Sequence, residues 1–377
     1  MTKQLINRLR QRWSGIEPRV DNKKQAVTES GEAGVTRRAI LQSLGLTAGG
    51  AIAAAALLPR LVGAQEEAYG SDEVTMGPHG MGPMVMPMTV GEVDHEFNGF
   101  NPSDIARDFD YGTVSVLPNG QTLREWTLTA EDKEIEIVPG IRFPAWTYNG
   151  RVPGPTLRAT EGDRLRIRFR NHSSMPHTVH FHGVHPFEMD GVPDAGPGSI
   201  QPGQSFTYEF DAEPFGCHLY HCHVFPLSRH IAKGMYGAFI VDPKEGRPKA
   251  DHELMMMMNG FDIDFDDEND FYAVNSIPFH YQTNPIDIRV GELVRIYLIN
   301  ILEFDPINSF HLHANFFHYY PTGTSLQPTE FSDTISQMQA QRGILEFRYK
   351  YPGMFMFHAH KTEFAELGWN GAFRVSP

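Results

Sequence analysis

Four His-x-His pairs are the residues best suited to chemistry in this chain of 377 residues, which holds 18 histidines. The pairs are His180 and His182, His221 and His223, His311 and His313, and His358 and His360. Residues i and i+2 of a β-strand point to the same face, so each pair would present two imidazoles together. Imidazole binds copper, zinc, iron and nickel. One pair alone could be structural, but eight imidazoles are too many for one ion and predict a cluster of several metal ions.

A second group of metal-ligand residue types overlaps the first at Cys222, which lies inside one of the His-x-His pairs. The members of this group are His177, Cys222, His230 and Met235. One thiolate, two imidazoles and a more distant thioether are the ligand set of a blue-copper electron-transfer site. The sequence therefore predicts a mononuclear blue-copper site directly beside the larger cluster.

Short strands are the elements expected to position these ligands. From about residue 90 onward, segments that alternate apolar and charged residues are separated by Gly, Pro and Asn turns; examples are residues 165–170, 206–210 and 345–349. A period of two is typical of half-buried strands, and no long helical period competes with it. The length of the chain and its 41% of hydrophobic residues suffice for two packed domains. We therefore expect an all-β protein of two tandem β-sandwiches.

The two expected domains repeat one pattern. Residues 179–182 recur as residues 310–313, and residues 220–223 recur as residues 357–360, with offsets of 131 and 137 residues. The predicted domains are residues 89–245 and 246–377. The second copy lacks the blue-copper ligands, so this site belongs to the first copy alone. At the four ligand positions the second copy has Asn308, Ala359, Phe364 and Trp369.

On these motifs the chain resembles the multicopper oxidases, specifically the two-domain bacterial members with blue copper in the first of two cupredoxin-like Greek-key domains. The resemblance covers residues 90–377. It implies about four coppers per chain, one type 1, one type 2 and two type 3. The implied type 1 ligands are His177, Cys222, His230 and Met235, and the implied type 2 ligands are His180 and His311. The implied type 3 ligands are His182, His221, His223, His313, His358 and His360.

The activity implied by the resemblance is that of a laccase-like oxidase. A phenol-type or metal-ion reductant would deliver single electrons to type 1 copper, and dioxygen would be reduced to water by four electrons at a trinuclear cluster. A cuprous or metal-ion oxidase for copper tolerance is one alternative, and a copper nitrite reductase is another. A nitrite reductase has one catalytic copper with three histidines, so it would leave several cluster histidines unused. These are His182, His223, His313 and His360. A non-enzymatic copper-buffering protein would not need the blue-copper site.

A homotrimer is the expected assembly. A trinuclear cluster needs two His pairs from a first domain and two from a second domain, facing each other. A two-domain chain can achieve this by joining head to tail into a closed ring. The resemblance implies three chains, with one cluster at each subunit interface.

Asp190 is the candidate for delivering protons to the cluster. It precedes Gly191 shortly after the first His pair, and the resemblance implies an acid that assists the cluster without binding metal. A turn aspartate ahead of glycine is an equally good interpretation. Glu363, close after His360, is a second candidate for the same role.

The N-terminus is typical of a twin-arginine export signal. Arg37 and Arg38 precede an apolar stretch from Ala39 to Leu58, and a cut is predicted after Ala64. An uncleaved membrane anchor is the alternative, although Ala and Gly make the stretch weakly apolar. We therefore expect a periplasmic or otherwise extracytoplasmic protein, with no stable membrane span in its mature form.

Charge and composition change sharply after this signal, residues 1–64. Residues 65–88 are a Met-rich leader that we expect to be flexible, and its thioethers would also suit Cu(I). The net charge of the whole chain is −14, and that of the signal is +6, so the net charge of residues 65–377 is −20. Such an acidic body excludes a nucleic-acid partner, because phosphate binding rests on clustered Lys and Arg.

One acidic stretch mimics the start of a calcium-binding loop. Asp262, Asp264 and Asp266 have the required spacing. Asp267 stands where such a loop needs Gly, and Ala273 where it needs Glu. We therefore predict that this stretch is not an EF-hand.

Overall fold

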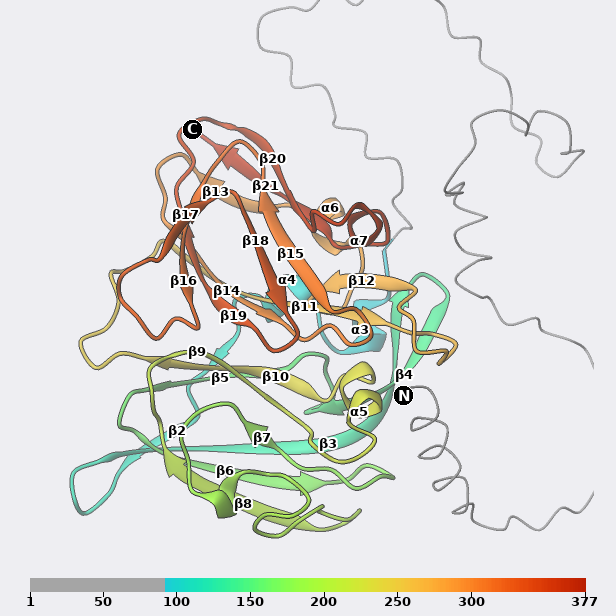
Figure 1. Ribbon diagram of the computed structural model, residues 1–377, viewed down its shortest axis with the longest axis vertical. Helices are drawn as coiled ribbons and strands as arrows, with labels where there is room; N and C mark the ends of the chain where they lie inside the picture. Colours follow the sequence, from blue (N-terminus) through green and yellow to red (C-terminus); the bar gives the residue numbers. More distant parts are fainter. Residues whose placement is uncertain (1–91) are drawn as a thin grey trace, which may run out of the picture. The chain divides into compact units, whose positions relative to one another are not determined.

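The computed structural model describes residues 92–377, which are drawn in colour in Figure 1. The predicted export signal and the Met-rich leader lie outside these residues. No helix of the described part is long and apolar enough to cross a membrane. The helices are short: α3 (His95–Asn98), α4 (Pro102–Ile105), η1 (Phe187–Met189), α5 (Leu227–Ala232), α6 (His280–Thr283) and α7 (Thr362–Glu366).

The first repeat forms two sheets around one core. The first sheet has the order β1-β5-β10-β9-β7, and the second has the order β2-β3-β6-β8, with β4 paired to β3. The strands of the first sheet are β1 (Phe109–Asp110), β5 (Gly154–Thr160), β7 (His180–Phe181), β9 (Gly216–His221) and β10 (Tyr236–Asp242). Those of the second are β2 (Thr113–Val116), β3 (Thr122–Val138), β4 (Ile141–Tyr148), β6 (Arg164–Asn171) and β8 (Ser205–Asp211).

The second repeat also forms two sheets. One has the order β12-β11-β14-β19-β16-β17 and the other β13-β21-β20-β15-β18. The strands of the former are β11 (His252–Phe261), β12 (Phe271–Val274), β14 (Val294–Asn300), β16 (Phe317–Pro321), β17 (Glu330–Ser332) and β19 (Arg342–Phe347). Those of the latter are β13 (Ile286–Arg289), β15 (Ile307–Leu312), β18 (Thr334–Met338), β20 (Gly353–His358) and β21 (Asn370–Ser376).

The strand orders of the two repeats correspond. The sequence β5-β10-β9-β7 in the first matches β13-β21-β20-β15 in the second, and β3-β6-β8 matches β11-β14-β19. Alternation is visible in β6, where Leu165, Ile167 and Phe169 are fully buried and the intervening arginines are more exposed. The prediction of an all-β protein with two tandem β-sandwiches is therefore confirmed.

Strand β11 is buried on both of its faces, which explains its run of four methionines. Met255 and Met257 pack in a hydrophobic cluster that includes Leu219 of the first domain. The alternate residues Met256 and Met258 pack in the core of the second domain. A strand in contact with two cores needs apolar side chains at successive positions, and a flexible thioether fits irregular space.

A buried ion-pair network also joins the two domains. Arg158 on β5 contacts Asp242 on β10, with Nε 2.7 Å from Oδ2, and Glu253 on β11, with a guanidinium nitrogen 2.9 Å from Oε2. Glu253 also accepts hydrogen bonds from the Tyr297 hydroxyl at 2.8 Å and from Arg295 at 3.1 Å. The Arg158 side chain is 7% exposed, so its contacts are shielded from solvent.

Replacing Arg158 with alanine is expected to destabilise the chain by about 3 kcal/mol, because two carboxylates lose a shielded partner while Arg295 still pairs with Glu253. Urea unfolding followed by tryptophan fluorescence measures this loss. Arg374→Ala is the matched control, since Arg374 pairs with Asp287 at 3.4 Å where both side chains are more than half exposed. The control should lose less than about 1 kcal/mol. Equal losses in the two variants would contradict a stabilising role for the network.

Candidate metal centres

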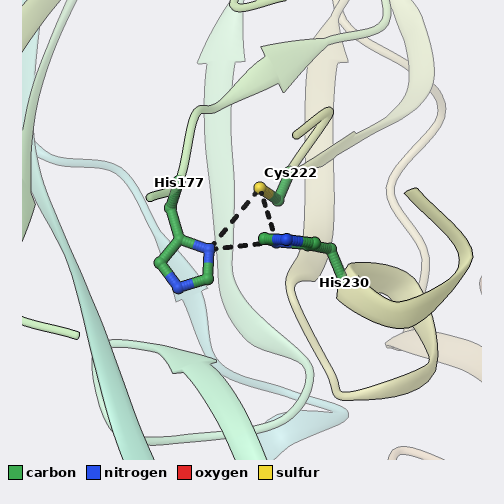
Figure 2. Close-up of side chains that lie close together, drawn as sticks. All are labelled: His177, Cys222 and His230. Carbon is green, nitrogen blue, oxygen red and sulfur yellow. Dashed lines mark hydrogen bonds between the residues drawn. The ribbon is translucent and has the colours of Figure 1, made fainter. Parts of the chain in front are cut away.

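A buried group of three ligand side chains lies at one end of the first domain. Nδ1 of His177 and Nδ1 of His230 are 3.1 Å apart, and Sγ of Cys222 lies 3.6 Å from the first and 3.2 Å from the second. Figure 2 shows the three side chains converging on a common point. All three are at most 1% exposed. The prediction that these residues lie together is therefore met by the geometry.

Backbone contacts bring these side chains together. Cys222 follows β9 directly, and His230 lies in the single turn-and-a-half of α5. The amide of Cys222 donates to the carbonyl of Met235, and the amide of Met235 donates to the carbonyl of His230. Met235 is fully buried and packs in the same hydrophobic core as Cys222. His177 is held by a bridge to Ile200. These hydrogen bonds join the two ends of the segment from Cys222 to Met235 and hold Cys222 and His230 close together.

Hydrogen bonds outside the group orient its ligand atoms. Nε2 of His177 lies 2.9 Å from the hydroxyl of Ser173, which donates to Asp132 Oδ1 at 2.6 Å. The hydroxyl proton is thereby used, so Nε2 of His177 donates and its Nδ1 carries the lone pair that faces Cys222. The amide of Thr178 donates to Cys222 Sγ at 3.4 Å, which favours a thiolate.

Burial keeps the free group uncharged. It lowers the pKa of His177 to about 3 and that of His230 to about 4, and it raises the pKa of the Cys222 thiol to about 11. Two imidazole nitrogens and a sulfur that face one another need a shared proton or a cation between them. Nitrogen and thiolate donors are the set that copper favours. The residues therefore fit a copper ion.

The first two His pairs form a quartet on β7 and at the end of β9. His180 pairs with His221 across the two strands, and Nε2 of His182 lies 3.1 Å from Nε2 of His221. The His180 ring is 5.2 Å from the His223 ring, centre to centre. Three of the four, His180, His182 and His221, have ligand atoms within 4.8 Å of one another. As predicted from the i, i+2 spacing, the two histidines of each pair lie on the same face.

The other two pairs form an equivalent quartet on β15 and β20. His311 pairs with His358, and Nε2 of His313 lies 2.9 Å from Nε2 of His358. The His360 ring is 5.1 Å from the His311 ring. His360 is exposed and the other three side chains are half-buried, so this quartet opens to the surface.

The hydrogen bonds around the two quartets repeat as the sequence does. His221 Nδ1 donates to the next carbonyl at 2.9 Å, and His358 does the same at 2.7 Å. His180 Nδ1 faces the carbonyl of Asp190 at 2.7 Å, and His311 Nδ1 faces a carbonyl at 3.1 Å. A carbonyl only accepts, so these imidazoles carry hydrogen on Nδ1 and a lone pair on Nε2. Four ligand nitrogens are thereby prepared for metal.

The two quartets do not meet within the described chain. Among residues 92–377, no group of ligand atoms within 4.8 Å combines a histidine of the first domain with one of the second. A cavity of about 820 Å³ lies beside His311 and His313 of the second quartet. Its lining includes Phe316 and Phe331, which are 48% and 63% exposed. An apolar, open surface therefore adjoins the second quartet.

In the second domain, aromatic packing replaces part of the buried group of the first domain. Phe364 and Trp369 stand at the positions of His230 and Met235, and both are fully buried. The ring of Phe364 stacks on Tyr272 with centres 3.9 Å apart, and Trp369 contacts Phe310. The sequence comparison of the two repeats predicted this difference.

Asp190 lies in a turn beside the first quartet. It ends η1 ahead of Gly191, whose φ of 68° suits a turn. Its Oδ1 is 3.2 Å from Nδ1 of His180 and 3.7 Å from Nε2 of His185. Glu363, the second candidate acid, pairs with Lys361 at 3.2 Å on α7.

Two residues near the centres were missed in the sequence. His185 falls outside the His-x-His pattern, yet its ring nitrogen is grouped with His180 and Asp190. Its position three residues after His182 was the available signal. Trp146 packs against His177 and His230, with ring centres 5.3 and 4.7 Å apart. Nothing local marks Trp146, because the contact spans more than thirty residues.

Comparisons with known proteins identify the family of this chain. Two family models described as multicopper oxidase match residues 129–246 and 250–377. A solved structure titled "Crystal structure of multicopper oxidase" is 65% identical, with a TM-score of 0.75, and covers 76% of this chain and 100% of that one. The "Blue Copper Oxidase" of Nitrosomonas europaea is 28% identical, with a TM-score of 0.60, and covers 67% of this chain and 86% of that one.

One relative is named for a different activity. The "Copper-containing nitrite reductase" of Neisseria meningitidis serogroup B is 30% identical over 279 residues, which are 69% of this chain and 67% of the relative. In two further Neisseria nitrite reductases the match spans 63% and 62% of their own length. The two family matches together cover well over half of this chain. The chain therefore belongs to the multicopper oxidase family, and it is a copper oxidoreductase of two cupredoxin-like domains.

Proposed function

We propose that this chain is a laccase-like oxidase that couples one-electron oxidation of an external reductant to four-electron reduction of dioxygen to water. The observation that carries the proposal is the pair of equivalent histidine quartets, one on each domain. Eight imidazoles, four of them with Nε2 made available by a hydrogen bond from Nδ1, suit a cluster of several coppers and exceed what one ion can use.

In the proposal, type 1 copper is held by the buried group of the first domain. The ligands are His177, Cys222, His230 and Met235. Bound copper would supply one-electron redox chemistry here, while the buried side chains fix its geometry and exclude water. Cys222 lies between His221 and His223 in the chain, so a short covalent path leads from this group to the first quartet.

The trinuclear cluster would use all eight quartet histidines. Type 2 copper would be held by His180 and His311. Type 3 copper would be held by His182, His221, His223, His313, His358 and His360. For His180, His221, His311 and His358, a carbonyl that accepts from Nδ1 holds the imidazole in the tautomer that offers Nε2 to a metal. Asp190, within reach of His180 and His185, is the proposed acid for proton delivery to this cluster.

The cluster would be completed between subunits of a homotrimer. Each quartet alone supplies half of the ligands, and the two quartets of one chain are not brought together. A head-to-tail ring places the first quartet of each chain against the second quartet of its neighbour. The open apolar surface beside His311 and His313 supports this arrangement, because exposed apolar patches are typical of interfaces.

Copper nitrite reduction is the second candidate, favoured by the likeness to the Neisseria enzymes. A single catalytic copper with three histidines would leave at least four of the eight quartet histidines without a metal. Oxidation of Cu(I) for copper tolerance is compatible with the same ligands as the leading proposal, and differs from it in the reductant.

The proposal includes the location of the protein and its domains. Residues 1–64 would be a twin-arginine signal. This signal would direct export of the chain to the periplasm or another extracytoplasmic space. The folded domains would be residues 89–245 and 246–377. Dioxygen and a small-molecule or metal-ion reductant would be its partners.

The test is steady-state oxygen uptake by the copper-loaded protein with a phenol, an aromatic amine, Fe(II) and Cu(I) as reductants, and with nitrite as an alternative acceptor. We expect oxygen uptake without peroxide release, and about four coppers per chain by metal analysis. Nitrite reduction without oxygen uptake would contradict the proposal, and so would saturation at one or two coppers per chain.

Met235→Leu is expected to leave the protein folded and blue while raising the type 1 reduction potential, because an axial thioether is a weak ligand that tunes the metal. Redox titration of the blue absorption measures the shift. Met257→Leu is the matched control, since Met257 is also fully buried but packs between the domains. An unchanged potential in Met235→Leu would show that Met235 is not the axial ligand.

A further inference from the structure

A cluster of carboxylates that includes no histidine lies in the loop between β11 and β12. Asp262, Asp264 and Asp270 each offer an oxygen, and these oxygens lie within 4.8 Å of one another. The loop is dense in negative charge, with six acidic residues among residues 262–270. The EF-hand pattern that the sequence excludes would use Asp266, whereas the structure groups Asp270 with Asp262 and Asp264.

Two of the three carboxylates are buried and lack a cationic partner. Asp262 is 3% exposed and Asp270 is 1% exposed, while Asp264 is exposed to solvent. No Lys or Arg within the described residues forms an ion pair with any of the three. Buried charges in proteins are normally paired or bound to a metal, so this cluster lacks positive charge.

Asp270 supplies an independent sign of a missing ligand. Its Oδ2 accepts the amide of Ile263 at 2.8 Å, but its buried Oδ1 has no hydrogen-bond partner within the described residues. Asp262 differs, because each of its oxygens accepts one backbone amide, from Asp266 at 3.1 Å and from Asp267 at 3.0 Å. Burial and the neighbouring carboxylates raise the pKa of Asp270 to about 6. The oxygen without a hydrogen-bond partner thus belongs to the least exposed of the three aspartates.

We propose that Asp262, Asp264 and Asp270 bind one calcium ion. All three donors are carboxylate oxygens, which are the ligands that a hard cation such as calcium prefers. Copper prefers nitrogen and sulfur ligands instead. Calcium accepts irregular sets of six to eight oxygens, so waters can complete the shell on the exposed side of Asp264. The ligand spacing is one, three and nine, which explains why the EF-hand pattern failed at Ala273.

The loop also touches the first domain beside the blue-copper group. The ring of Phe265 lies 5.2 Å from Nζ of Lys233 and 6.0 Å from the guanidinium carbon of Arg229. It also packs near Phe143 of β4. Arg229 precedes His230 in α5, so a calcium ion that fixes the loop would also fix the contact between the second domain and this helix.

The experiment is calorimetric titration of the copper-loaded chain with calcium chloride, after dialysis against calcium-free buffer. We expect one calcium per chain with a Kd of about 1 mM or tighter, the range of extracellular calcium modules. Asp270→Asn keeps the size of the side chain and the acceptor for Ile263, and should weaken binding at least about tenfold. Unchanged blue absorption would show that its copper site is intact.

Asp267→Asn is the matched control, since it removes the same charge from the same loop outside the group. Its φ of 70° is tolerated by asparagine. This variant should bind calcium within about threefold of the parent. Calcium should raise the Tm of the parent and of Asp267→Asn, but not that of Asp270→Asn, which should be as stable as the parent without calcium. The proposal is wrong if the parent binds no calcium at about 10 mM, or if Asp270→Asn binds it as the parent does.

Discussion

Cys222→Ser is expected to abolish the intense blue absorption of the loaded protein and to reduce oxygen uptake at least about 100-fold. The colour requires a copper–thiolate bond, and a hydroxyl in this buried position cannot replace it. The same residue links the group to His221 and His223, so electron delivery to the first quartet would fail as well. Absorption spectroscopy and an oxygen electrode measure the two losses.

Cys217→Ser provides a control of the same chemical change. Cys217 is the other cysteine, free and fully buried, and it packs in the cluster between the domains. This variant should keep its blue absorption and its oxygen uptake per bound copper. A Cys222→Ser protein that stays blue would refute the assignment of the thiolate.

Mixing inactive His182→Ala and inactive His313→Ala chains is expected to restore oxidase activity once subunits exchange. Each interface in the proposed trimer combines a first quartet with the second quartet of a neighbour. With random mixing of equal amounts, about a quarter of the interfaces receive two intact quartets. Oxygen uptake should therefore return to about a quarter of the parent value.

The control for this experiment is a mixture of His182→Ala with His221→Ala. Both substitutions lie in the first quartet, so no interface can be intact and no activity should return. Mass spectrometry of the assemblies verifies that exchange has taken place. Exchange without restored activity in the first mixture would exclude a cluster shared between subunits.

The grouping of the paired histidines could be predicted from the sequence because two simple periodicities determine it. A period of two places His180 and His182 on one face, and the repeat places His311 and His313 on the equivalent strand. The same comparison of the repeats predicted that Phe364 and Trp369 replace His230 and Met235 in the second domain. Alternating patterns such as residues 165–170 were sufficient for the all-β prediction.

Contacts between distant segments could not be predicted in the same way. Trp146 reaches His177 only because β4 and the loop before β7 lie together in the fold. The EF-hand template compared fixed positions, so it missed that the turn after Phe265 brings Asp270 back to Asp262. Sequence spacing gives local geometry, whereas these contacts depend on how the loops close.

The aromatic filling at Phe364 and Trp369 makes the two domains differ in what completes their folding. In the first domain, the side chains of His177, Cys222 and His230 meet in the core, and this arrangement destabilises the domain until a cation binds between them. In the second domain, ring contacts close the same space without any ion. A chelator would therefore destabilise the first domain more than the second. In the chain without metal, the second domain would stay folded, and the first domain would regain its structure beside it when metal is added again.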